Sequence, residues 1–232
     1  MTAEVDILTP IHKAIRAMIY DLGDQLQTTD FTDLAQTEAV VRQLKHEFTA
    51  AITSNCILCL VHHHGLGEEM QAFPELAKFD GPLIDRLLKE HRQFEMRLSA
   101  LSKIGTQLES LSEPAARIRM GIRLNRGANE FFAAYFAHMN EEEEKLLPLL
   151  LEHFTDEQII AFSTHIEESM PPERFQEYMR WLLPSLNANE LTEMFRGIKM
   201  EPDPEVLGAF TSLAENHVDP ARWRIVKSRV GM

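Results

Sequence analysis

The sequence is poor in the residues that mark several common classes of protein. Only two of its 232 residues are cysteines, Cys56 and Cys59. They form a single CxxC inside the apolar stretch AITSNCILCLV, with no second CxxC and no βαβ pattern, so a zinc or thioredoxin-like site has little support. We therefore interpret both thiols as buried structural groups, because free cysteine behaves as a small hydrophobe.

Positive charge and long apolar segments are also scarce. The formal net charge is −13 and the pI is near 5.2, which argues against a nucleic-acid-binding protein because such proteins need a basic face. Lysines and arginines are scattered, without a polybasic cluster for anionic lipid. The longest near-apolar stretch, Cys56 to Val61, is too short to span a bilayer, and the N-terminus lacks the apolar region of a signal peptide. We therefore expect a soluble cytoplasmic protein that binds neither nucleic acid nor membrane.

Glycine is scarce and the alternation typical of strands is absent, so the pattern predicts an all-α fold. Helix starts are indicated by a capping residue or turn followed by proline, as in Thr9-Pro10, Asp80-Gly81-Pro82 and Ser112-Glu113-Pro114. Four long helices are predicted, from residue 9 to about 23 and over residues 33–72, 82–110 and 114–151, with Pro74 ending the second. We predict that residues 1–152 form an up-down-up-down four-helix bundle.

Residues 153–232 differ in character from the bundle. Shorter helices are predicted at 172–184, 187–199 and 203–215, followed by a tail that contains Pro220 and Trp223. No pair of ligand-like residues occurs among them. We expect a C-terminal helical extension that covers the bundle or mediates association with a protein partner or a second copy of the chain.

One pattern, a histidine followed four residues later by a glutamate, recurs in the predicted bundle. The three pairs are His64/Glu68, His91/Glu95 and His138/Glu142. A four-residue step on an α-helix turns about 400°, so each pair projects from one face of its helix. Two pairs match further, because Pro74 and Pro148 each follow the glutamate by six residues. The motif His-x3-Glu-x5-Pro therefore occurs twice.

All three pairs are predicted to lie at one end of the bundle, together with His12. In an up-down-up-down bundle the starts of the first and third helices lie beside the finishes of the second and fourth. His12 is near the start of the first helix, and each pair is near the same shared end. Converging imidazoles and carboxylates would form a metal site of the kind that holds two iron ions. Manganese or a mixed Fe/Mn pair would suit the same ligands.

Two of the predicted ligands have an alternative residue, and one other class of metal-binding bundle has to be considered. Gly65 and Gly67 lie inside the first pair and weaken its helical turn, so His62 or His63 could replace His64. A shift of register in the fourth helix would bring Glu143 to the place of Glu142. A ferritin-like site is set aside, because it uses Glu-x-x-His on two helices and no histidine here has a glutamate three residues before it.

Three segments together, HHHGLGEEMQAFPEL, EHRQFE and HMNEEEEKLLPLL, resemble the hemerythrin-like (HHE cation-binding) proteins over roughly residues 8–152. These proteins are four-helix bundles that hold a non-haem di-iron centre. The resemblance implies Glu68 and Glu142 as bridging carboxylates and Glu95 as a terminal carboxylate. It implies four terminal imidazole ligands, His12, His64, His91 and His138. Because oxygen carriers have histidine where Glu95 stands, the ligand set is closer to the carboxylate-richer iron- and oxygen-sensing branch.

The resemblance implies a di-iron protein that binds or reacts with O2, peroxide or NO. Sensing or ligand binding is placed ahead of catalysis, because the metal ligands are readable in the sequence and a substrate pocket is not. Whether the chain is an enzyme stays open. One alternative is a di-iron oxidoreductase of the peroxidase, catalase or oxygenase kind. Another is an iron-responsive interaction module, in which metal loading orders the bundle and residues 153–232 present the binding surface.

Overall fold

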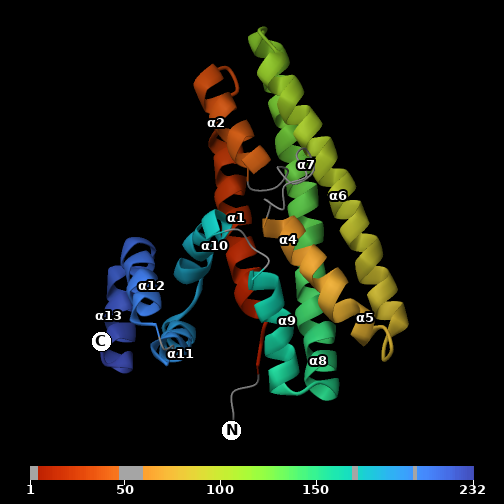
Figure 1. The fold of residues 1–232 in the computed structure, drawn as a ribbon. Coiled ribbons are helices and arrows are strands. Elements are labelled where there is room, and N and C mark those ends of the chain that lie inside the picture. Colours follow the sequence, from red (N-terminus) through yellow and green to blue (C-terminus); the bar gives the residue numbers. More distant parts are fainter. Residues whose placement is uncertain (1–4, 47–59, 169–171, 201–202) are drawn as a thin grey trace. The chain divides into compact units, whose positions relative to one another are not determined.

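The structure is a computed structural model that describes residues 5–46, 60–168, 172–200 and 203–232, and every regular element in these ranges is a helix (Figure 1). The predicted all-α fold is confirmed. The chain divides into two compact units, one that runs to Thr9 and from Met18 through α9 (Asp156–Glu168), and one that contains Pro10–Ala17 and the C-terminal helices. No helix in the described ranges has the length and apolar character needed to cross a membrane.

The first unit is a helical bundle. Its helices are α1 (Thr9–Thr28, from Met18 onward), α2 (Leu34–Leu44), α4 (Leu60–Gly67), η2 (Glu68–Ala72), α5 (Phe73–Leu76), α6 (Gly81–Ser110), α7 (Pro114–Glu141), η3 (Glu142–Leu146), α8 (Leu147–His153) and α9. The predicted starts of the two longest helices are confirmed. The carboxylate of Asp80 accepts from the N–H of Leu83 at 3.0 Å, and that of Glu113 accepts from Ala115 at 2.8 Å. The long helices α6 and α7 pack side by side along the bundle (Figure 1).

Among the described residues, π-helical turns occur at η2 and η3 and also at Lys45 and His46 after α2, and the sequence did not predict them. In η2 the N–H of Phe73 donates to the carbonyl of Glu68, and in η3 the N–H of Leu147 donates to Glu142. Pro74 was expected to end its helix, but the helix continues to Leu76. The expectation was wrong because the proline follows a widened turn, in which its missing N–H and its ring are tolerated.

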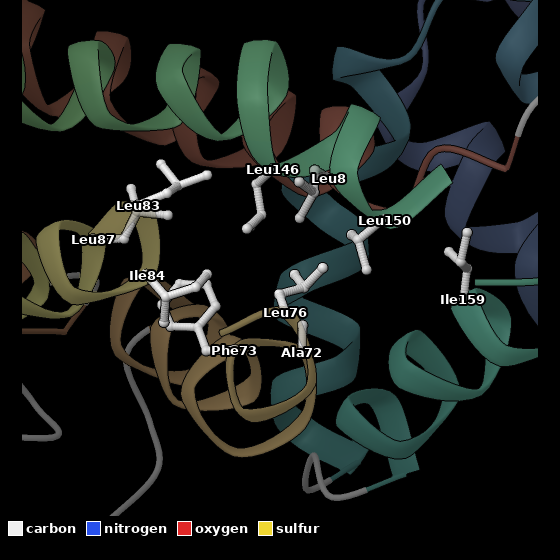
Figure 2. Close-up of a cluster of buried hydrophobic side chains, with 10 residues drawn as sticks. All are labelled: Leu8, Ala72, Phe73, Leu76, Leu83, Ile84, Leu87, Leu146, Leu150 and Ile159. Atoms are coloured by element: carbon white, nitrogen blue, oxygen red, sulfur yellow. The ribbon is translucent and has the colours of Figure 1, made fainter. Parts of the chain in front are cut away.

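An apolar cluster begins one turn beyond the two π-turn glutamates and closes this end of the bundle. Figure 2 shows its side chains, which are Leu8, Ala72, Phe73, Leu76, Leu83, Ile84, Leu87, Leu146, Leu150 and Ile159. The cluster joins residues that follow η2 and η3 to the first turns of α6. Burying each large side chain stabilises the fold by about 1.5–3 kcal/mol. This packing holds the neighbouring turns of three helices in fixed positions.

The second unit is built mainly from α10 (Pro172–Ser185), α11 (Ala188–Lys199), α12 (Pro204–His217) and α13 (Pro220–Val230). The first three confirm the predicted helices. The predicted tail is wrong, because it is the helix α13. Asp219 caps this helix by accepting from the N–H of Arg222 at 2.9 Å, with Pro220 at its first position. The pair Asp219-Pro220 is the sequence signal for the start of α13. The predicted domain boundary after residue 152 stays a prediction.

Candidate metal centre

Five of the seven predicted ligands lie together in the first unit, and each is at most 7% exposed. They are His64 on α4, Glu68 at the start of η2, His91 on α6, His138 on α7 and Glu142 at the start of η3. On α6 and α7 the histidine occupies the apolar face of its helix. On α6, for example, His91 follows buried Leu87 by four residues and precedes buried Phe94 by three. The helical periodicity that forms the core therefore also turns these side chains inward.

The Nε2 atoms of the three imidazoles converge on the two buried carboxylates. The Nε2 atom of His64 lies 3.5 Å from Glu68 Oε1, and that of His91 lies 3.6 Å from Glu68 Oε2. On the other side, His138 Nε2 lies 2.9 Å from Glu142 Oε1, and His91 Nε2 lies 3.7 Å from the same oxygen. The Nε2 atoms of His91 and His138 are 2.9 Å apart. Two of the predicted pairs, together with His91 of the third, therefore meet across three helices.

Glu142 belongs to two overlapping groups of metal-ligand atoms. Its carboxylate lies within 4.8 Å of ligand atoms of His64 and Glu68, and also of ligand atoms of His91 and His138. The side chain of Glu142 is fully buried. Glu142 is therefore a candidate ligand in both groups.

Two further carboxylates, which the sequence analysis missed, bind the outer nitrogens of the imidazoles. His91 Nδ1 lies 2.8 Å from Glu69 Oε1, and His138 Nδ1 lies 2.7 Å from Glu90 Oε2. A carboxylate only accepts, so each Nδ1 carries the hydrogen and each Nε2 faces the centre. Metal-bound histidines are usually oriented in this way by a carboxylate. The only signal in the sequence was that Glu69 and Glu90 each adjoin a predicted ligand.

The site favours positive charge even without a metal ion. Burial lowers the pKa of His91, but hydrogen bonds to Glu142 and Glu69 and the charges of Glu68 and Glu142 outweigh it and raise the pKa to about 10. A proton on Nε2 also removes the repulsion between the facing nitrogens of His91 and His138. In the metal-free chain this proton lies between His138 and the carboxylates of Glu68 and Glu142.

The raised pKa of His91 predicts how the stability of the metal-free protein depends on pH. The folded chain binds the proton more tightly than the unfolded chain, whose histidine keeps its usual pKa of 6.5. The stabilisation from His91 is therefore complete below pH 6.5 and is lost as the pH rises towards 10. Urea unfolding of metal-free protein should show stability falling across this range, and the fall should shrink in H91Q. A stability that rises between pH 6.5 and 10 would contradict the prediction.

The donor set fits a first-row transition metal. Three imidazole nitrogens and two carboxylates converge, and no thiolate belongs to either ligand group among the described residues. Imidazole and carboxylate together suit iron and manganese, whereas zinc clusters and iron–sulfur sites commonly use thiolates. The outer carboxylates also hold two of the imidazoles in the tautomer that a metal ion requires.

The structure leaves the third predicted carboxylate, Glu95, outside this cluster. Its side chain is exposed, and it belongs to neither ligand group, whereas His91 on the same helix is buried. A four-residue step on an α-helix turns about 40° past one full turn, and on α6 it places Glu95 on the exposed side of His91. The inward positions nearby are taken by Phe94 and Leu98.

The remaining predictions for the site have different outcomes. His12 is fully buried on α1, in the stretch Pro10–Ala17 that belongs to the second unit, and its role as a ligand stays a prediction. The side chains of His62 and His63 lie outside the described residues, as do Cys56 and Cys59. α4 stays α-helical through Gly67, and His64 is buried beside Glu68. These positions favour His64 over its two neighbours.

An aromatic wall borders the centre on the side of His138. The ring centroid of Phe94 lies 5.0 Å from that of His138, and the ring of Tyr135 lies 5.8 Å from it. Phe131 stacks on Tyr135, and Phe73 stacks on His91 with centroids 5.5 Å apart. Apolar walls limit the access of solvent to a metal site and lower its local dielectric constant.

The fold and the site define a class, because a helical bundle with converging buried imidazoles and carboxylates is a metal-binding protein of the non-haem iron kind. The family model described as "Hemerythrin HHE cation binding domain" matches residues 3–150. The match covers more than half of the chain, and the chain belongs to this family. A search of curated proteins gave no match, and neither did a search of solved structures.

Proposed function

We propose that this protein holds two iron ions in the buried cluster and that the centre binds or reacts with O2, peroxide or NO. The observation that carries the proposal is Glu142, which is fully buried and shared by two groups of ligand atoms. In this assignment Glu68 and Glu142 bridge the two ions. His64, His91 and His138 are terminal ligands. Iron would supply electrons and an open coordination position for a small oxidant.

His12 is proposed as the fourth imidazole ligand. It is fully buried and lies on the helix face of α1 that carries buried Ile15, Ile19 and Leu22 at spacings of three, seven and ten residues. Glu95 is a weaker candidate, because its exposure requires a change of rotamer or helix rotation before it could reach the centre.

The charges of the cluster support binding of divalent cations. The carboxylates of Glu68 and Glu142 are buried beside the imidazoles, whereas those of Glu69 and Glu90 are partly exposed and contact the outer nitrogens. Buried charges are costly unless they are compensated, so cations bound between Glu68 and Glu142 would stabilise the bundle.

The proposed reactivity is tested by loading the chain with Fe(II) in the absence of oxygen and then exposing it to O2. We expect new visible absorption bands on exposure. Bands that fade when the solution is purged with argon would indicate reversible binding, hence carriage or sensing. Bands that persist would indicate oxidation of the centre, as in an enzyme or a redox sensor. A chain that binds iron but gives no bands with O2, peroxide or NO would contradict the proposed reactivity.

Glu90 provides a prediction about the orientation of a ligand. Without its carboxylate, the imidazole of His138 loses the partner that fixes its tautomer and ring position. We expect E90A to weaken metal binding by about 10- to 100-fold, measured by titration with Fe(II) under anaerobic conditions. E90Q should recover part of the loss, because its amide oxygen still accepts a hydrogen bond. E130A, which removes an exposed glutamate from α7, should bind like the parent. Equal affinities in E90A and E130A would contradict this role.

An iron-responsive interaction module is a second candidate function. It is favoured by the separate compact unit that contains α10 to α13. Arg222 of α13 donates to the carbonyls of Pro184 at 2.7 Å and Leu186 at 2.8 Å, so the unit is tied together by its own contacts. In this function the partner is a protein or a second copy of the chain. This function predicts that the assembly state of the chain changes when iron binds. Light scattering would detect the change as a difference in molar mass between the metal-free and the iron-loaded chain.

A further inference from the structure

The two copies of His-x3-Glu-x5-Pro fold in the same way. In each copy the glutamate opens a π-helical turn, as Glu68 does in η2 and Glu142 does in η3. In each copy the proline then takes the second position of the next α-helical segment, as Pro74 does in α5 and Pro148 does in α8. π turns are rare in proteins, and those that occur often lie at functional sites. A repeat of both sequence and backbone indicates a shared role.

The prolines act on the backbone rather than on the apolar core. Both Pro74 and Pro148 are exposed, so neither fills space in the interior. A proline within an α-helix lacks a donor N–H, and its ring clashes with the carbonyl four residues before it. Those carbonyls belong to Met70 and Glu144, and both lie inside the π turns. The wider turn relieves this clash, so a proline at this position favours the π turn over the α turn.

The π turn keeps each glutamate on the same face of the helix as the residues four and eight positions after it. On a regular α-helix a four-residue step drifts by about 40°, and three steps drift by about 120°. Both copies nevertheless bury four residues in series at this spacing, namely His64, Glu68, Ala72 and Leu76, and His138, Glu142, Leu146 and Leu150. A π turn rotates less per residue, because its hydrogen bonds span five residues, and so offsets the drift. Each glutamate then stays on the face that continues into the apolar cluster, in which Figure 2 shows Leu76, Leu146 and Leu150.

We propose that Pro74 and Pro148 are positioning residues for the metal centre, acting through the π turns that aim Glu68 and Glu142. This inference rests on the proposed function, in which these glutamates are metal ligands. Glu95 shows the converse case. No proline follows it at this spacing, its helix has no π turn, and its side chain is exposed. The proline is thus present after the two buried glutamates and absent after the exposed one.

The test compares P74A, P148A and the double variant with the parent chain, using Co(II) as the probe under anaerobic conditions. We expect Kd for Co(II) to rise at least tenfold in the double variant and its visible absorption bands to shift, because the carboxylates reorient. Thermal unfolding of the metal-free double variant should be unchanged or higher, because alanine favours helix. P82A is the matched control, since Pro82 also holds the second position of a helix, α6, but follows no π turn. It should bind Co(II) like the parent.

The outcomes separate this inference from the proposed function. A parent that binds Co(II) and a double variant with the same Kd and the same bands would overturn the role of the prolines and leave the metal site intact. A loss of binding accompanied by an equal loss of stability in the metal-free variant would also overturn it, because the prolines would then be supporting the fold. A parent that binds neither Co(II) nor Fe(II) would overturn the proposed function and this inference with it.

Discussion

Replacing Glu142 with alanine is expected to reduce the iron content of the loaded chain from two ions to fewer than one. Glu142 is shared by both groups of ligand atoms and is fully buried, so its removal takes a ligand from each position. Loss of a bridging carboxylate also leaves the remaining charges closer to neutral and lowers the attraction for cations. Iron per chain is measured by mass spectrometry after anaerobic loading and removal of unbound metal.

The matched control for this experiment is E144A. Glu144 lies two residues further along η3, carries the same charge and is exposed. Its removal should leave the iron content unchanged. E68A should resemble E142A, because Glu68 opens the other π turn and contacts His64 and His91. Two ions retained in both E68A and E142A would rule out bridging by these glutamates.

Replacing Gly121 with alanine is expected to destabilise the bundle while leaving the metal centre intact. A Cβ atom at this position would lie 2.3 Å from the ring of Phe31, far inside van der Waals contact. The ring cannot easily withdraw, because Arg117 donates to the carbonyl of Phe31 at 3.0 Å and to that of Thr32 at 2.6 Å. Overpacking of this kind costs about 1–3 kcal/mol. Thermal unfolding should therefore begin several degrees lower.

A second glycine on the same helix supplies the control. In G127A the new methyl group would meet only Leu101 Cδ2, at 3.1 Å, and the end of a leucine side chain can move. Alanine also favours the helix by about 1 kcal/mol over glycine. G127A should therefore be much less destabilised than G121A. Both variants should retain the parent's iron content, because Phe31 precedes α2 at the far end of the bundle from His138. G121A as stable as the parent would contradict the account.

The parts predictable from the sequence were those set by local rules. Capping residues with proline gave the starts of α6 and α7, and helical spacing gave the His64/Glu68 and His138/Glu142 pairs. The extra helix α13 was missed although Asp219-Pro220 carries the same signal. The resemblance to the hemerythrin-like family rested on the segments that contain these pairs, and the family match over residues 3–150 confirms that resemblance.

The parts that could not be predicted depend on contacts between helices. Glu69 and Glu90 bind imidazoles of residues on other helices, and no spacing within one helix encodes that contact. Glu95 is exposed because Phe94 and Leu98 hold the inward positions beside it on α6, and its role as a ligand stays a prediction. The sequence shows Pro74 and Pro148 as parts of a repeated motif, but the π turns that precede them are visible only in the structure. Side chains near a site are thus harder to predict than the helices that carry them.

The central claim is that one buried cluster binds two metal ions that share Glu142. Anaerobic titration of the metal-free chain with Fe(II), with bound iron counted per chain at saturation, tests it most directly. The account predicts two ions per parent chain and the loss of both high-affinity positions in E142A. A parent that saturates with one ion, or with none, would contradict the claim.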